Sequence, residues 1–125
     1  MNKWIRIIVA LPALLFVVMG LRWATDPGGA AAGLGMTLME GVGLSAQIGD
    51  VGGMFLSMGI MMLVGVATAN RVWLCAPALM LSLIAIFRVI AWAAHGAALT
   101  PDTIAIEVVV ASLLLFAATR ITADN

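Results

Sequence analysis

Residues 72–94 read VWLCAPALMLSLIAIFRVIAWAA, and Arg88 is the one charged residue in this run. A helix needs about 20 mostly apolar residues to cross the hydrocarbon core of a bilayer, and this stretch is long enough to do so. The run is almost continuously apolar, whereas a strand of a membrane barrel alternates between apolar and polar positions. The stretch therefore predicts a membrane-spanning helix.

The composition of the whole chain also indicates an integral membrane protein. Its 125 residues are 64% hydrophobic and 10% charged, whereas globular domains are about 45–50% apolar and about 25% charged. A soluble domain of this size has a large surface relative to its volume and needs polar residues to cover it. The lipid bilayer is therefore the first expected partner. Because the net charge is zero, the chain offers no basic surface for nucleic acid.

Three other apolar runs predict three further crossings of the membrane. Consecutive crossings alternate in direction, so the expected fold is an all-α integral membrane protein. We expect one domain over residues 1–125, an up-down bundle of four transmembrane helices. The predicted spans are about 4–22, 45–68, 72–94 and 103–119, with a short interfacial segment at 27–44.

Turn-forming residues stand between the predicted spans. Asp26 and Pro27 combine a capping acid with a first-turn proline, which predicts a short helix that Gly35 ends. The segment 100–102, Thr-Pro-Asp, has the same arrangement and predicts the start of the fourth span. The segment 69–71, Ala-Asn-Arg, predicts a tight turn between the second and third spans.

The tryptophans are spaced to anchor two of the spans at both membrane surfaces. Trp4 and Trp23 are 19 residues apart, and so are Trp73 and Trp92. A helix of that length rises about 28 Å, which is close to the thickness of the hydrocarbon core. Indole rings favour the headgroup region, so we expect all four as interfacial anchors.

The distribution of cations predicts the orientation of the chain. Lysine and arginine concentrate on the side that holds both termini, while the other side has only Arg22 at the end of a span. Cytoplasmic segments of membrane proteins carry the excess of these residues, so both termini are expected in the cytoplasm. The cations on the terminal side are Lys3, Arg6, Arg71 and Arg120.

Three ionisable residues are predicted to lie inside the spans. Asp50, Arg88 and Glu107 stand on three different helices, each a few residues below the outer surface. Ionisable side chains inside a membrane are costly and are candidates for function. Arg22 ends the first span on the same side, and His95 lies on the Arg88 face of the third span, nearer the surface.

Two interpretations of this polar cluster remain open. Arg88 can bridge both carboxylates and lock the helices in register, because its guanidinium offers five donors. Alternatively, the three side chains line an outward-facing pocket for a small polar ligand or a lipid headgroup, or form a proton pathway. Arg22 and His95 are the further candidates for such a pocket.

The second span carries a row of small residues beside Asp50. Gly49, Gly53 and Ser57 recur every four residues, so they share one face of the helix. Small residues at this spacing allow another helix to approach closely. We therefore expect this face to pack against a neighbouring helix.

The sequence contains no recognisable catalytic or cofactor-binding motif. Cys75 is the single cysteine, so no disulfide within the chain and no Cys-x-x-Cys metal site is expected. Arg88 would oppose a cation held by the neighbouring acids. We therefore expect no metal, no cofactor and no enzyme activity.

Four short motifs resemble the bacterial four-helix membrane protein family of unknown function numbered 4345. They are residues 20–23 (GLRW) with Asp26-Pro27, residues 49–56 (GDVGGMFL), the pair Phe87-Arg88, and Glu107. Phe87 departs from the small residue that the family pattern favours and would narrow any pocket. The resemblance implies a four-helix membrane fold without an assigned activity, and it adds weight to Asp50, Arg88 and Glu107 as a polar core.

These observations predict a multi-pass protein of the bacterial inner membrane. The favoured function is a non-catalytic accessory or scaffold subunit of a membrane assembly, or a bundle that self-associates as a homo-oligomer. The alternative is a binder or carrier of a small amphiphile or lipid, or a proton pathway, that uses the polar cluster.

Overall fold

A computed structural model describes residues 2–124, and the described part is helical with no strand. Within it, four helices are long and apolar enough to cross a membrane, as predicted. The elements are α1 (Lys3–Thr25), α2 (Pro27–Gly33), α3 (Gly41–Ala46), the π-helix η1 (Gln47–Gly52), α4 (Gly53–Thr68), α5 (Val72–His95) and α6 (Pro101–Asp124). Elements α3, η1 and α4 follow one another without a break, so the second candidate span is one long helix from Gly41 to Thr68.

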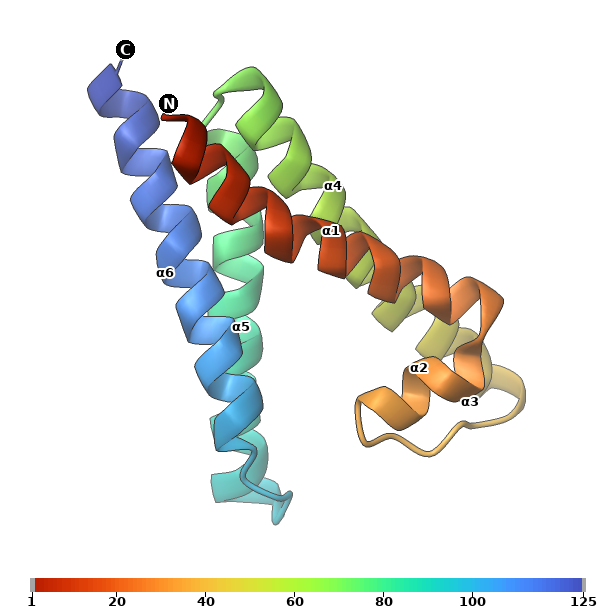
Figure 1. Cartoon of the computed structure of the whole chain (residues 1–125). Coiled ribbons are helices and arrows are strands. Elements are labelled where there is room, and N and C mark those ends of the chain that lie inside the picture. Colours follow the sequence, from red (N-terminus) through yellow and green to blue (C-terminus); the bar gives the residue numbers. More distant parts are fainter. Residues whose placement is uncertain (1, 125) are drawn as a thin grey trace.

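The long helices form two hairpins that diverge from one end (Figure 1). Helix α1 packs along α4, and α5 packs along α6. The hairpins meet where both ends of the described chain and the 69–71 turn lie, which we call the terminal end. They separate toward the open end, which carries α2, α3 and the 96–100 loop. The predicted four-helix bundle is therefore closed at one end and V-shaped overall.

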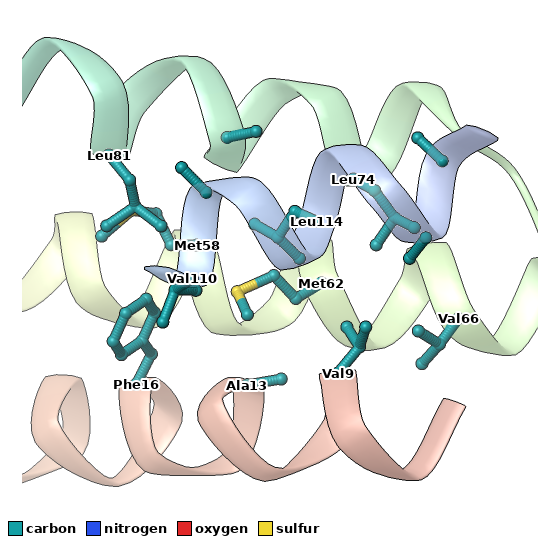
Figure 2. Close-up of a cluster of buried hydrophobic side chains, with 14 of the residues drawn as sticks. Val9, Ala13, Phe16, Met58, Met62, Val66, Leu74, Leu81, Val110 and Leu114 are labelled. Atoms are coloured by element: carbon teal, nitrogen blue, oxygen red, sulfur yellow. The ribbon is translucent and has the colours of Figure 1, made fainter. Parts of the chain in front are cut away.

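The terminal half is held by apolar side chains from all the long helices. Figure 2 shows Phe16 and Ala13 of α1 on one side of this core, with Met58 and Met62 of α4 and Leu114 of α6 also pointing into it. Dispersion between closely packed atoms drives such contacts in a membrane, because lipid is as apolar as the side chains. The other buried members include Val9, Val66, Leu74, Ala78, Leu81, Val110, Ala111, Ala117, Ala118 and Ile121.

Glycines allow α1 and α4 to lie against each other. A Cβ atom on Gly59 would stand 2.8 Å from the carbonyl oxygen of Ala13. A Cβ atom on Gly20 would stand 2.6 Å from the backbone nitrogen of Leu56. Real Cβ atoms essentially never approach backbone atoms so closely, so the two helices can meet here only because these side chains are absent.

The predicted packing face at Gly49, Gly53 and Ser57 is not the face that packs within the chain. All three residues are exposed, and a Cβ atom on Gly49 or Gly53 would meet nothing within 4 Å. The contact with α1 is made instead at Gly52 and Gly59. Spacing shows which residues share a helix face, but two faces of this helix carry small residues, and only tertiary packing distinguishes them.

We predict opposite effects of alanine at Gly59 and at Gly53. Gly59→Ala places a methyl group against the α1 backbone and should destabilise the protein by about 1–3 kcal/mol, as overpacking does. Gly53→Ala is the matched control, because its added methyl group has free space and alanine favours a helix. Unfolding by SDS titration in mixed micelles measures both. Equal stability of the two variants would contradict close packing at Gly59.

The short helix α2 begins and ends as the sequence predicts. The Asp26 side chain accepts a hydrogen bond from the Gly29 backbone N–H at 3.2 Å, and Pro27 is the first helical residue. Gly35 follows the helix in the left-handed region, with φ +70. The capping bond gives a partner to one of the amide groups that the start of a helix leaves unpaired, which matters in a helix of only 7 residues.

The tight turn between the second and third candidate spans also forms at the predicted residues. Ala69 ends α4 in the left-handed region with φ 51. The Asn70 side chain accepts a hydrogen bond from the Val72 backbone N–H at 3.1 Å, at the start of α5. The left-handed residue and this local hydrogen bond allow the chain to reverse its direction over residues 69–71.

Trp23 is covered by α2, which corrects one predicted membrane anchor. It is 1% exposed and packs with Ala30 and Ala31. Since α2 follows the last turn of α1 and packs against that helix, it covers the indole ring, which is therefore not exposed on the surface of the chain as an anchor must be. The other three tryptophans, Trp4, Trp73 and Trp92, are exposed, and their anchoring role stays a prediction.

The buried side chain of Gln47 in η1 forms hydrogen bonds with the irregular segment that connects α2 to α3. Only 3% of this residue is exposed. Its Nε2 donates to the Thr37 carbonyl at 3.0 Å, and its Oε1 accepts from the Met39 N–H at 2.8 Å. One amide thus satisfies two backbone groups in a segment without regular structure, which keeps residues 37–39 against η1.

We predict that Gln47→Leu releases the 37–39 segment. The Thr37 carbonyl and the Met39 N–H lose their partners in an exposed segment, and each lost hydrogen bond costs about 0.5–1.5 kcal/mol. Hydrogen exchange at Met39 should accelerate, while exchange in α5 and α6 stays unchanged. Glu40→Gln is the control, because Glu40 is exposed on the same connection. Unchanged exchange at Met39 in Gln47→Leu would show that the amide does not hold the segment.

Candidate functional site

A cleft of about 360 Å³ lies between the two hairpins, on the side of the open end. Helices α5 and α6 supply one wall, which contains the charged and hydroxyl side chains of the site. Gly33 and Leu34, at the end of α2, contribute to the lining. Helices α1 and α4 supply an apolar wall, made by Leu15, Phe16, Met19, Met54, Phe55 and Met58.

Arg88 and Glu107 form an ion pair in the polar wall. The Arg88 Nε donates to Glu107 Oε1 at 2.7 Å, which is a short, charge-assisted hydrogen bond. The Glu107 side chain is 9% exposed, and the Arg88 side chain is 38% exposed. The pair forms because α5 and α6 are antiparallel neighbours, so the end of one helix lies level with the beginning of the next.

Part of the hydrogen-bonding capacity of this pair remains unused. Among residues 2–124, neither terminal nitrogen of the Arg88 guanidinium, Nη1 or Nη2, has a hydrogen-bond partner. The second carboxylate oxygen of Glu107, Oε2, has none within the same residues. The lining of the cleft therefore includes one side chain with unused donors and one with an unused acceptor.

The structure does not bring Asp50 into the predicted cluster. Asp50 is exposed on η1, and within the described part of the chain it makes no ion pair with Arg88. The reason is the divergence of the hairpins: Asp50 belongs to the α1–α4 hairpin, whereas Arg88 and Glu107 both belong to the α5–α6 hairpin. The expected cluster of three is a pair.

Arg22 and His95 also lie outside the cleft lining. Arg22 Nη2 is 3.6 Å from Asp26 Oδ2, one helical turn further along the chain, and both side chains are more than half exposed. Such exposed pairs contribute little to stability. His95 is exposed in the last turn of α5, where Gly96 ends the helix with a positive φ.

Two polar residues of the cleft are absent from the predicted site. Asp102 and Thr103 stand in the first turn of α6 and line the same cleft as Glu107. The sequence does contain a signal for one of them, because Thr103 and Glu107 are four residues apart and share a helix face. Asp102 has no such signal, since the start of a helix is sufficient to explain an acid at that position.

The described residues contain no group of three His, Cys, Asp or Glu side chains that could hold a metal ion. The cleft lining can instead form two kinds of contact with a ligand. One wall can contact hydrocarbon, and the other can form hydrogen bonds and ion pairs with a polar group. A molecule with an apolar body and a polar head matches both walls.

No family model, curated protein or solved structure matches this chain. Its resemblance to the family numbered 4345 therefore stays a prediction. The cleft and the residues that line it are the basis on which a function can be proposed.

We predict that the ion pair stabilises the α5–α6 hairpin most visibly when one partner is removed. Arg88→Met leaves Glu107 buried without its cation and should destabilise the protein by about 2 kcal/mol, the usual scale for a hydrogen bond to a charged group. The double variant Arg88→Met/Glu107→Gln removes both charges and should recover part of that loss. SDS titration measures all the variants. Additive losses would show that the two side chains are not coupled.

Proposed function

We propose that this protein binds a membrane amphiphile in the cleft between its two hairpins. The observation that carries the proposal is one cleft with an apolar wall from α1 and α4 and a mixed wall from α5 and α6. The mixed wall sets Arg88 and Glu107 among the apolar side chains of Leu81, Ile84 and Ile106. Ligand sites typically combine mostly apolar linings with a few polar groups that fix orientation. A purely structural ion pair would not need an apolar cleft beside it.

The dimensions of the cleft suit part of a lipid-like molecule. Its volume of about 360 Å³ falls near the lower end of the usual range for ligand sites, roughly 300–1,000 Å³. We expect the polar head and the first carbons of the apolar chain to occupy it. Because the hairpins diverge, the remainder of the chain can extend between them into the bilayer.

The proposed location is the bacterial inner membrane, with the cleft in the outer leaflet. Arg6 and Arg120 stand near the two ends of the chain and Arg71 stands in the 69–71 turn, all of which gather at the terminal end. Cytoplasmic segments carry the excess of basic residues, so this distribution supports cytoplasmic termini and an open end that faces outward. We assign a binding or carrier role to the cleft and no chemical step.

A second candidate function is self-association or attachment to a larger membrane assembly. Its support is the exposed face at Gly49, Gly53 and Ser57, where no part of the described chain packs. Small residues at this spacing allow close helix contact in a membrane. If Gly53→Leu dissociates an oligomer that the parent protein forms in native mass spectra, this candidate gains support.

We predict that filling the cleft abolishes amphiphile binding. Ile106 is exposed on α6 and lines the cleft, so Ile106→Trp places an indole ring where the ligand would lie. Val109→Trp is the matched control, because Val109 is exposed on the same helix and is not part of the cleft lining. Native mass spectrometry of protein released from lipid nanodiscs should show bound lipid in the parent and in Val109→Trp, but not in Ile106→Trp.

The outcomes separate binding in the cleft from general adhesion of lipid. Equal lipid retention by both tryptophan variants would place the lipid elsewhere on the surface and contradict the proposal. Absence of retained lipid from the parent protein would contradict it as well. Unfolding by SDS titration establishes that both variants are folded before the spectra are compared.

A further inference from the structure

We propose that the cleft selects an amphiphile whose head group carries both a phosphate and a protonated amine. This inference rests on the proposed function, because it names the ligand class of the same cleft. Three side chains carry it: Arg88, Glu107 and Asp102. All three line one cleft, and together they carry donors and acceptors that have no partner within residues 2–124.

The unpaired donors are those of Arg88. Its Nε is occupied by Glu107, while Nη1 and Nη2 have no partner among residues 2–124. A guanidinium presents its N–H groups as a planar fork that matches two oxygens of a phosphate. A ligand without an acceptor group would leave these donors unpaired at the edge of the hydrocarbon region, which is costly.

The unpaired acceptors are carboxylate oxygens of α6. Glu107 uses Oε1 for Arg88 and has no partner for Oε2 within the described residues. Asp102 is exposed in the first turn of α6 and also lines the cleft. A protonated amine supplies N–H donors and a positive charge to either carboxylate.

The order of the groups along α6 matches the order of groups in a phospholipid. Glu107 is five residues further into α6 than Asp102, which corresponds to about 7.5 Å along the helix axis. The apolar wall continues along α4 from Met54 to Met58, which is four residues closer to the terminal end. From the terminal end toward the open end, the cleft is therefore lined first by apolar side chains, then by Arg88 and Glu107, and then by Asp102. An aminophospholipid has its chains, its phosphate and its amine in the same order.

The charge of the lining favours this head group over an anionic one. Arg88, Glu107 and Asp102 carry formal charges that add to −1. A phosphate alone would add a further negative charge to a site that already has an excess. A head group with phosphate and amine leaves the total unchanged, and it pairs the donors of Arg88 as well as the carboxylates.

The test is competition among three phospholipids with identical acyl chains. Nanodiscs contain equal amounts of phosphatidylethanolamine, phosphatidylcholine and phosphatidylglycerol, and native mass spectrometry identifies the lipid that stays bound. Phosphatidylcholine has the positive charge but no N–H donor, and phosphatidylglycerol has no cation. We expect about tenfold enrichment of phosphatidylethanolamine over each of the others, the ratio that one charge-assisted hydrogen bond provides.

Two variants and a control assign the selectivity to the named residues. Asp102→Asn keeps a polar side chain of the same size but removes the charge, so it should lower the preference for phosphatidylethanolamine while lipid remains bound. Glu40→Gln removes an exposed acid outside the cleft lining and should leave the preference unchanged. Arg88→Lys keeps a cation near Glu107 but loses the fork, so it should weaken retention of all three phospholipids.

The possible failures are distinguishable. Retention of the three lipids in equal amounts, together with loss of all of them in Ile106→Trp, would overturn the head-group inference and leave the proposed function intact. Equal selectivity in Asp102→Asn and the parent would also overturn it. Retention of no lipid by the parent would overturn the proposed function, and the inference with it.

Discussion

The hydrogen bond between Arg88 and Glu107 joins α5 to α6, whereas the core that the long helices share in the described part of the chain is apolar. A charged side chain inside a bilayer is tolerated when it pairs with an opposite charge. Here the pairing is incomplete, because the Nη atoms of Arg88 and Oε2 of Glu107 have no partners within residues 2–124. The ion pair therefore stabilises the α5–α6 hairpin and also gives its cleft-facing wall a polar character.

The V shape follows from where the close contacts lie. All the long helices contribute apolar side chains to the core toward the terminal end (Figure 2). Toward the open end, Gly20 and Gly52 bring α1 and the second candidate span together, and α2 and Trp23 add a small apolar cluster of their own. That cluster belongs to one hairpin alone, so nothing in it draws the other hairpin closer. The cleft is the space that this separation leaves.

The candidate site could be predicted only in part. Arg88 and Glu107 meet because two consecutive helices joined by a short loop must run side by side, and their positions in the sequence fix their relative heights. Sequence position predicts a similar height for Asp50, but Asp50 stands on the other hairpin. Its distance from Arg88 depends on the angle between the hairpins, which no local pattern encodes. No pattern signals the role of Gln47 either, because its partners lie in an irregular segment.

Local sequence patterns are sufficient to predict four candidate membrane spans and the residues at which α2 and the 69–71 turn begin and end. These depend on hydrophobic length, which a bilayer of fixed thickness demands, and on bonds between near neighbours. Tertiary packing, which no local pattern encodes, places Gly59 and not Gly53 against α1 and buries Trp23 under α2. It also decided that two hairpins diverge around a cleft. Each of these outcomes depends on which of several similar helix faces pack together. The close packing of all the side chains at once selects those faces.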